Sequence, residues 1–378
     1  MSLPDELPRF ERLTAEQDEV QFLPLNGNFL ISGPPGTGKS VMAIHRAQAL
    51  AIDDRTPVLL MYNRVLNSYT TSLIENLGPV GRVMTFHRWM HEFWTTTYGS
   101  RPPMSGNDDW AYDWTAVATR ILTDPPPRDR DLVVDEGQDM PLGFYRLARW
   151  ICRSVTVFAD ENQHLREVNT TLREIELAIG ADRHLVLRHN HRNSREIAAL
   201  ASWFHCGLPT DVPELPTRRH QPGPRLHAYA GSAQFVTAVA TYARRRPGAR
   251  IGIAVHTLEQ QERLVAGLVR HRMAVQTYAS GSKKLSIDIM KPGVKVLTYM
   301  SIKGLQFDTL FVPGLDAVTE DVTSASLRMR YYVVLSRACN ELELSYFGRG
   351  EPPIVAQIPH DLLRRTDLEL LEAESSPC

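Results

Sequence analysis

The 378-residue chain lacks long apolar segments, a leader sequence and a strong net charge. No run of about 18 or more apolar residues occurs, so no transmembrane helix is predicted. The first residues, MSLPDELPRFERL, contain neither a basic leader nor an apolar secretion core. A net charge of −1 leaves any contact with a polyanion to local basic patches, such as Arg244–Arg246 with Arg250, or Arg218, Arg219 and Arg225. We therefore expect a soluble, cytoplasmic protein with no membrane partner.

Cysteine is also scarce. The four cysteines, Cys152, Cys206, Cys339 and Cys378, are scattered without the spacing of a CxxC motif or of a Cys/His metal site. This pattern argues against a disulfide framework and against structural zinc. A reducing compartment fits this composition.

Short apolar runs rich in β-branched residues alternate with helical patterns, which is typical of parallel α/β sheets. In the first half we expect strands over residues 28–32, 57–61, 82–85, 132–135, 155–159 and 185–187, with helices such as 40–51 and 142–151 between them. The alternation restarts after residue 190, with strands near 225–229, 250–254, 294–298, 309–312 and 342–346. We therefore expect two domains, 1–183 and 184–378, with a surface loop over 209–224 and a short flexible carboxyl-terminal tail.

One glycine-rich segment matches the pattern GxxxxGK[ST] between an expected strand and an expected helix. It consists of Gly33, Pro34, Pro35, Gly36, Thr37, Gly38, Lys39 and Ser40. Its glycines let backbone N–H groups turn inward around phosphate oxygens, and the helix that follows contributes its positive end. We predict that Lys39 reaches the β- and γ-phosphates of ATP and that Ser40 binds Mg²⁺. A glycine-rich turn without a ligand is the alternative.

Two acids end the apolar run Leu132-Val133-Val134-Asp135-Glu136. A carboxylate at the carboxyl end of a strand in such a sheet lies beside the phosphate loop, so we predict that Asp135 binds Mg²⁺. Glu136 could then accept a proton from the attacking water. On its own, an apolar run that ends in two acids marks only a strand that leaves the core. The predicted roles of Asp135 and Glu136 depend on the presence of the glycine-rich segment in the same chain.

Further short motifs occur in order along residues 13–347, and together they resemble those of superfamily 1 DNA helicases of the UvrD/Rep/PcrA type. They are LTAEQ at 13–17, YNR at 62–64, TFH at 85–87, DEGQD at 135–139, DENQ at 160–163, NHRN at 190–193, Thr298 with KGLQFD at 303–308, and YVVLSRA at 332–338. The resemblance implies two tandem RecA-like P-loop NTPase domains with parallel sheets and an ATP cleft between them.

The resemblance also implies roles for individual residues. Gln17 would pair with the adenine edge, Gln163 and Gln306 would contact the nucleotide, and Glu136 would be the catalytic base. Arg192 and Arg337 would approach the γ-phosphate from the second domain, which links hydrolysis to closure of the cleft. Single-stranded DNA would be contacted by Asn63, Arg64, Thr85, Phe86, His87, Thr298 and Lys303.

The chain departs from the family at several positions. The stretches 88–131 and 194–293 are too short for the accessory domains that larger members insert there. Val41 and His191 replace the residues that sandwich adenine in the family, so use of GTP or dATP stays open. Ala159, Ser301 and Gln306 replace a usual glycine, histidine and glutamate, and these changes bear on coupling to DNA.

Residues 88–131 hold four of the six tryptophans, namely Trp89, Trp94, Trp110 and Trp114. Aromatic side chains could stack on the bases of a single strand. The helical spacing of Trp110 and Trp114 instead favours packing in a core.

These patterns lead to the hypothesis of an ATP-dependent single-stranded DNA translocase or helicase, with 3′→5′ polarity taken from the resemblance alone. Two alternatives stay open. The chain could be a DNA-stimulated ATPase subunit of a larger complex, such as a nuclease or defence system, in which a partner protein supplies nuclease or strand-separation activity. It could also be a helicase directed to RNA.

Overall fold

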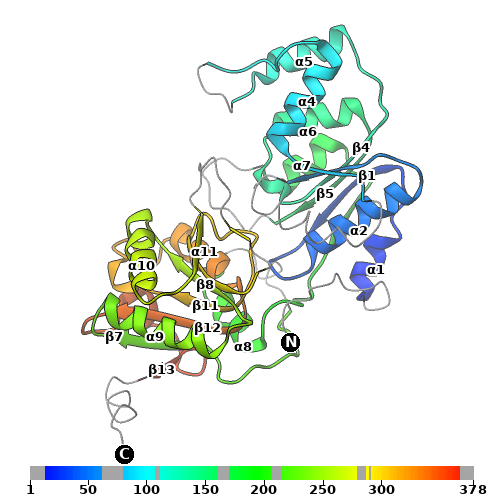
Figure 1. Cartoon of the computed structure of the whole chain (residues 1–378). Helices are drawn as coiled ribbons and strands as arrows, with labels where there is room; N and C mark the ends of the chain where they lie inside the picture. Colours follow the sequence, from blue (N-terminus) through cyan, green and yellow to red (C-terminus); the bar gives the residue numbers. More distant parts are fainter. Residues whose placement is uncertain are drawn as a thin grey trace, which may run out of the picture. The chain divides into compact units, whose positions relative to one another are not determined.

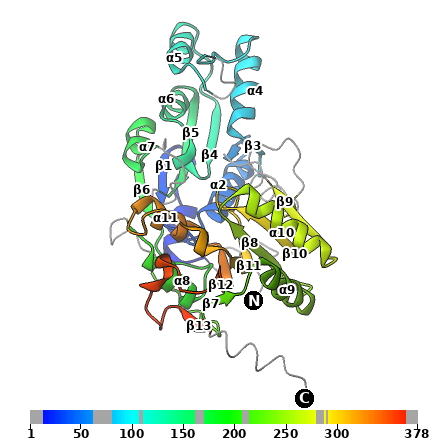
Figure 2. The same ribbon diagram turned by 90° about the vertical axis from the view of Figure 1, so that its left-hand side faces the viewer.

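The computed structural model divides into two compact units at Arg188 and His189, and each unit has its own parallel sheet (Figures 1 and 2). The structure describes residues 13–61, 80–106, 111–160, 170–206, 214–278, 287–288 and 291–366. The expected domain boundary after residue 183 falls at the start of β6 (Arg183–Val186), which pairs with β1 (Gly27–Ser32). β6 therefore belongs to the first unit, and the division between the units lies after this strand, at Arg188 and His189.

The first unit is a sheet with helices on both faces. Its described strands have the order β3-β2-β4-β5-β1-β6, and every neighbouring pair is parallel. Besides β1 and β6, the strands are β2 (Val58–Met61), β3 (Arg82–Thr85), β4 (Arg130–Val134) and β5 (Cys152–Ala159). The helices are α1 (Ala15–Gln21), α2 (Lys39–Ile52), α4 (Phe86–Tyr98), α5 (Trp114–Thr123), α6 (Leu142–Ile151) and α7 (Leu172–Ile179), with a 3₁₀ turn η2 (Gly137–Asp139).

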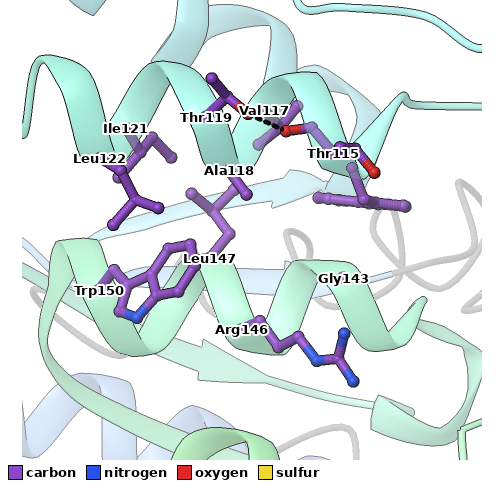
Figure 3. A pocket seen from close by; sticks show the side chains of 11 residues that line it. Thr115, Val117, Ala118, Thr119, Ile121, Leu122, Gly143, Arg146, Leu147 and Trp150 are labelled. Atoms are coloured by element: carbon purple, nitrogen blue, oxygen red, sulfur yellow. Dashed lines mark hydrogen bonds between the residues drawn. The ribbon is translucent and has the colours of Figure 1, made fainter.

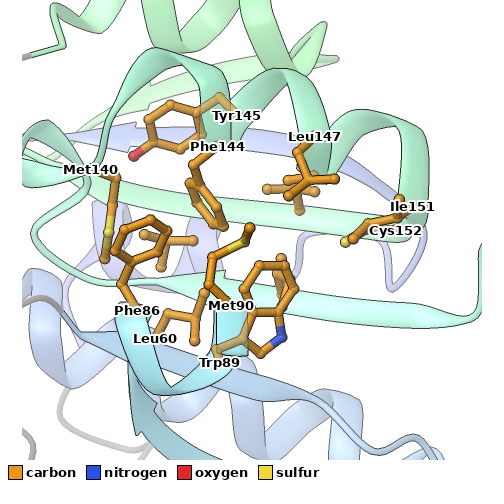
Figure 4. Packing of buried hydrophobic residues seen from close by; sticks show 14 of the residues in the cluster. Leu60, Phe86, Trp89, Met90, Met140, Phe144, Tyr145, Leu147, Ile151 and Cys152 are labelled. Carbon is orange, nitrogen blue, oxygen red and sulfur yellow. The ribbon is translucent and has the colours of Figure 1, made fainter. Parts of the chain in front are cut away.

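Successive side chains along the strands of the first unit point to opposite faces of the sheet, and both faces are apolar. Leu30 and Leu60 point to the face covered by α4, α6 and α7, whereas Ile31 and Leu59 point to the face covered by α1 and α2. On the first of these faces, aromatic rings from α4 and α6 pack closely around Phe144 (Figure 4). The sheet is thus buried on both sides, as parallel sheets require.

The second unit repeats this layered plan with the strand order β13-β7-β12-β11-β8-β10-β9, again parallel throughout its described pairs. Its strands are β7 (Arg225–Tyr229), β8 (Arg250–Val255), β9 (Val275–Tyr278), β10 (Gly293–Thr298), β11 (Phe307–Val312), β12 (Ala338–Phe347) and β13 (Arg364–Thr366). Its helical elements are α8 (Arg195–Trp203), α9 (Ser232–Arg245), α10 (Leu258–Arg270), η4 (Leu315–Ala317), α11 (Ala325–Leu335) and α12 (Pro353–Ala356). The expected α/β class with parallel sheets is confirmed.

Two edge strands of the second sheet, β9 and β13, were not predicted from the sequence. In β9 no residue before Tyr278 is fully buried, and β13 has only three residues, two of them arginines. Arg365 in β13 forms an ion pair with Glu351 at 2.7 Å. Residues 367–378, for which we expect a flexible tail, lie outside the described residues. Among the helices that the structure describes, none has the length and apolar character needed to span a bilayer.

Buried polar residues lie between β7 and β12 in the second unit. Tyr229 donates a hydrogen bond to Glu343 Oε1 at 2.8 Å, and His227 Nε2 lies 3.5 Å from Glu343 Oε2. Burial raises the pKa of Glu343 to about 7 and lowers the pKa of His227 to about 4. Between these pH values both side chains are neutral, which avoids an uncompensated charge inside the unit.

The packing around Phe144 leads to a stability prediction. Phe144 is fully buried, and its ring centre lies 5.3 Å from that of Phe86 and 5.6 Å from that of Trp89. Phe144→Ala should lower the free energy of unfolding of the first unit by about 3–5 kcal/mol, since a cavity is left. Leu122→Ala, at a side chain that is 70 % exposed, should change it by less than about 0.5 kcal/mol. Urea unfolding followed by tryptophan fluorescence measures both, and equal effects would contradict the packing.

The raised pKa of Glu343 predicts a pH-dependent stability. The folded state holds this proton more tightly than the unfolded state, so stability falls as pH rises from about 4.5 to about 7. Glu343→Gln should therefore stabilise the second unit at pH 8, by at most about 3 kcal/mol, and the gain should vanish near pH 4.5. Hydrogen exchange of the β12 amides, compared between variants at the same pH, measures this difference. The matched change Glu259→Gln, on an exposed side chain of α10, should have little effect at either pH.

Candidate functional site

The glycine-rich segment forms a tight loop between β1 and α2. Gly36 and Gly38 have φ values of +92° and +90°, a region that residues with a Cβ rarely occupy. Gly38 is also the residue that caps α2, so the loop leads directly into the first turn of that helix. This geometry turns backbone N–H groups toward the loop interior and places the positive end of a helix there, an arrangement suited to an anion.

Lys39 folds back over this loop. Its ammonium donates hydrogen bonds to the carbonyl oxygens of Gly33 at 2.5 Å and Pro34 at 3.0 Å, and it forms an ion pair with Asp160 at 3.2 Å. The side chains of Lys39 and Asp160 are 7 % and 1 % exposed. A buried ammonium with several partners is a fixed positive charge inside the loop.

The acids at the end of β4 lie at the same edge of the sheet. Asp135 is buried, and its Oδ1 accepts a hydrogen bond from the Glu136 N–H at 3.0 Å. Burial, then the charge of Glu136, raises the pKa of Asp135 to about 7, while the nearby Ser40 hydroxyl and Lys39 ammonium oppose this rise. Glu136 itself has a φ of +53°, an uncommon conformation for a residue with a side chain.

Asp135 and Ser40 fit the expected magnesium ligands. The Asp135 Oδ2 atom is buried and accepts no hydrogen bond from the residues that the structure describes. Mg²⁺ prefers oxygen ligands and is usually held by one or two carboxylates together with phosphate oxygens and water. Within the described ranges no group of three or more His, Cys, Asp or Glu side chains could hold a metal.

Gln138 joins the two acidic segments. Its Nε2 donates to Glu136 Oε2 at 2.6 Å, and its Oε1 accepts from the Asp160 N–H at 2.9 Å. The Thr170 N–H in turn donates to the Gln138 carbonyl at 3.1 Å. Nothing in the sequence indicates that Gln138 fixes both the general-base candidate Glu136 and the backbone of Asp160, whose side chain pairs with Lys39.

Gln17 lies against the loop. Its Nε2 donates to the Thr37 carbonyl at 3.2 Å, and its Oε1 accepts from the Thr14 N–H at 3.2 Å. The second contact is half of a capping box that starts α1, so helix capping places Gln17 beside the loop. Three other predicted site residues, Asn63, Arg64 and Gln163, lie outside the described residues.

The predicted DNA contacts at the start of α4 differ in exposure. Thr85 is the residue before the helix, and His87 stacks on Tyr112. Phe86 is only 1 % exposed and packs edge-on against Phe144, so its side chain contributes to the core. Trp89 and Trp94 are also buried, which confirms core packing as the explanation for these tryptophans, while Trp110 lies outside the described residues.

The second unit holds Arg192 in a set of hydrogen bonds. The orientation of the Gln306 side-chain amide that satisfies its neighbours turns its oxygen toward Arg192, where it accepts from Nε at 3.0 Å and from Nη2 at 2.8 Å. The Arg192 N–H donates to Asn190 Oδ1 at 3.0 Å, and its carbonyl accepts from Arg218 at 2.6 Å. Arg218, which the sequence offers only as part of a basic patch, is thus a structural residue of this segment.

Arg337 lies next to this set. It is 1 % exposed, its Nε donates to the Val333 carbonyl at 2.9 Å, and its own carbonyl accepts from the Phe307 N–H at 3.0 Å. Asn193 Nδ2 donates to the Ser336 carbonyl at 3.0 Å, which attaches the Arg192 segment to the Arg337 segment. The structure therefore brings together both arginines that the sequence predicts for this unit.

Thr298 lies at the carboxyl ends of the parallel strands of the second sheet, and Gln306 lies at their amino ends. Thr298 ends β10, whereas Gln306 comes directly before β11, and both strands run parallel to β8 between them. The Thr298 hydroxyl donates to Ser301 Oγ at 3.0 Å. Lys303 lies in the segment that connects the two strands. The segment from Thr298 to Gln306 therefore runs from the carboxyl ends of the strands to their amino ends.

A separate groove of about 300 Å³ lies between α5 and α6 (Figure 3). Ile121, Leu122, Leu147 and Trp150 line one end of it, and Arg146 is its one ionisable lining residue. No residue of the glycine-rich loop lines this groove. Its apolar lining does not suit a triphosphate, and it contains none of the predicted site residues.

Comparisons with known proteins place few limits on this chain. No family model and no curated protein matches it. Among solved structures, it is similar to the C-terminal domain of a possible DNA helicase from Lactobacillus plantarum WCFS1. That similarity has 20 % identity and a TM-score of 0.36, and it covers 47 % of this chain and 98 % of the other. Function must therefore be argued from the site itself.

The contacts of Gln138 predict a loss of stability in a variant. Gln138→Ala leaves at least the Asp160 N–H without its acceptor in a fully buried position, so the free energy of unfolding of the first unit should fall by about 1–3 kcal/mol. The exposed change Thr119→Ala on α5 serves as the control and should have a much smaller effect. Guanidinium unfolding measures both variants, and wild-type stability in Gln138→Ala would show that these bonds contribute nothing.

Proposed function

We propose that the chain is an ATP-dependent motor that moves on single-stranded DNA, of the type that its motifs resemble. The observation that carries this proposal is the arrangement at one edge of the first sheet. There a glycine-rich loop holds the Lys39 ammonium, and Asp135 and Glu136 directly follow the strand β4. A fixed cation, a metal-ligating carboxylate and a general base are the groups that phosphoryl transfer to water requires.

In the proposed reaction, the loop amides and Lys39 bind the β- and γ-phosphates, and Ser40 and Asp135 hold Mg²⁺. The metal would neutralise charge that develops on the phosphate oxygens. Glu136, oriented by Gln138, accepts the proton of the water that attacks the γ-phosphorus. Gln17 and Gln163 complete the nucleotide site in this proposal.

Arg192 and Arg337 supply the guanidinium groups in the proposed mechanism. When the two units close on a nucleotide, these arginines would stabilise the charge of the transition state, and opening would release the products. Both arginines are held by hydrogen bonds within the second unit, so movement of that unit would carry them together.

The segment from Thr298 to Gln306 supports the proposed coupling of hydrolysis to movement. The proposed DNA contact Thr298 lies at one end, the proposed DNA contact Lys303 lies within the segment, and Gln306 at the other end contacts Arg192. Ile302 and Leu305 between them are buried, so a shift at one end is transmitted through packed side chains. Polarity from 3′ to 5′ is proposed from the resemblance alone.

A second candidate is a DNA-stimulated ATPase subunit that needs a partner protein for strand separation or nuclease activity. Among the described residues, 88–131 include most of α4, which packs on the first sheet, and α5, which packs on α6, while 195–278 form helices and strands of the second unit. Neither stretch builds a further domain in the described ranges. If the purified chain hydrolyses ATP on DNA but separates strands only with a second protein, this candidate is favoured.

The direct test is the rate of ATP hydrolysis with and without single-stranded DNA. We expect stimulation by DNA and abolition of hydrolysis in Lys39→Ala, because the fixed cation at the phosphates is lost. Circular dichroism should show that this variant keeps its secondary structure. Wild-type turnover in Lys39→Ala would contradict the assignment of the loop, and no stimulation by any polynucleotide would contradict the motor. Stronger stimulation by RNA than by DNA would favour an RNA-directed helicase.

A further inference from the structure

The side-chain amide of Gln306 holds the guanidinium group of Arg192 in one orientation. One amide oxygen accepts from Nε at 3.0 Å and from Nη2 at 2.8 Å, which fixes one edge of the planar group. Two hydrogen bonds to one acceptor define both the position and the plane of the guanidinium. The edge that includes Nη1 takes no part in this contact.

The residues on either side of this contact are fixed by the fold. The backbone of Arg192 is held by Asn190 and Arg218 through hydrogen bonds of 3.0 Å and 2.6 Å. Gln306 lies between Leu305, which is 1 % exposed, and Phe307, whose N–H donates to the Arg337 carbonyl. The backbone that carries Gln306 is therefore attached to the segment that carries Arg337.

We propose that Gln306 is a positioning residue for Arg192 and acts on the reaction through this arginine. The inference rests on the proposed function, and it assigns to Gln306 a different role from the nucleotide contact that the resemblance implies. The two hydrogen bonds from Gln306 hold the guanidinium in one orientation relative to the backbone that carries Arg337. Holding the long side chain in one orientation also removes the entropy cost of ordering it during each turnover.

The first test compares two substitutions of Gln306 in DNA-stimulated ATP hydrolysis by the full chain. Gln306→Ala removes the acceptor, so kcat should fall about tenfold while KM for ATP stays within about twofold. Gln306→Glu keeps an oxygen that can accept both hydrogen bonds, so kcat should stay within about threefold of the wild type. A merely structural role would lower the melting temperature of Gln306→Ala without this split between kcat and KM.

The second test is a double-mutant cycle with Arg192→Ala. If Gln306 acts through Arg192, then Gln306→Ala should cause no further loss of kcat once Arg192 is alanine. A full additional loss in that background would overturn the inference. A rise in KM at unchanged kcat in Gln306→Ala would also overturn it, because Gln306 would then contact the nucleotide itself.

Failure of the inference can be distinguished from failure of the proposed function. If Gln306→Ala hydrolyses ATP like the wild type while Lys39→Ala is inactive and Arg192→Ala keeps only a small measurable fraction of the wild-type kcat, the inference fails and the proposed function stands. If Arg192→Ala also hydrolyses ATP at the wild-type rate, the arginine part of the proposed function fails, and the inference fails with it. Absence of DNA-stimulated hydrolysis in the wild type overturns both.

Discussion

All strands of the first sheet run in the same direction, and this constraint sends the loops that follow them out from one edge. The glycine-rich loop follows β1, Asp135 follows β4 and Asp160 follows β5, which lies between those two strands. Residues from three distant parts of the sequence therefore meet at one place. The ion pair of Lys39 with Asp160 and the contacts of Gln138 then fix their relative positions.

The polar groups at this edge of the first sheet are buried by the elements packed around them. Helices cover both faces of the first sheet, so Lys39, Asp135 and Glu136 lie in a largely dry environment. There a charge interacts more strongly with its neighbours than in water, and each unpaired polar atom is costly. The raised pKa of Asp135 reflects this burial.

The second unit uses hydrogen bonds to fix two arginines. Asn193 ties the segment of Arg192 to that of Arg337, and Gln306 orients the Arg192 guanidinium. These groups come from the start of α8, the end of α11 and the start of β11, so a rigid unit carries them as one group. Basic residues that the sequence offers as a nucleic-acid patch have other partners here, since Arg250 is buried against Asp308.

The sequence by itself determined the alternation of strands and helices, the two parallel sheets and the glycine-rich loop, because these depend on local periodicity and on residues that lie close together in the chain. It did not determine the short edge strands β9 and β13, whose few residues carry little apolar signal. Only the tertiary structure decided that Phe86 belongs to the core, that Gln138 bridges Glu136 and Asp160, and that Gln306 binds Arg192. The contacts of Phe86 with Phe144, of Gln138 with Asp160 and of Gln306 with Arg192 join residues that are distant in the chain, and neither composition nor spacing specifies the packing that brings them together.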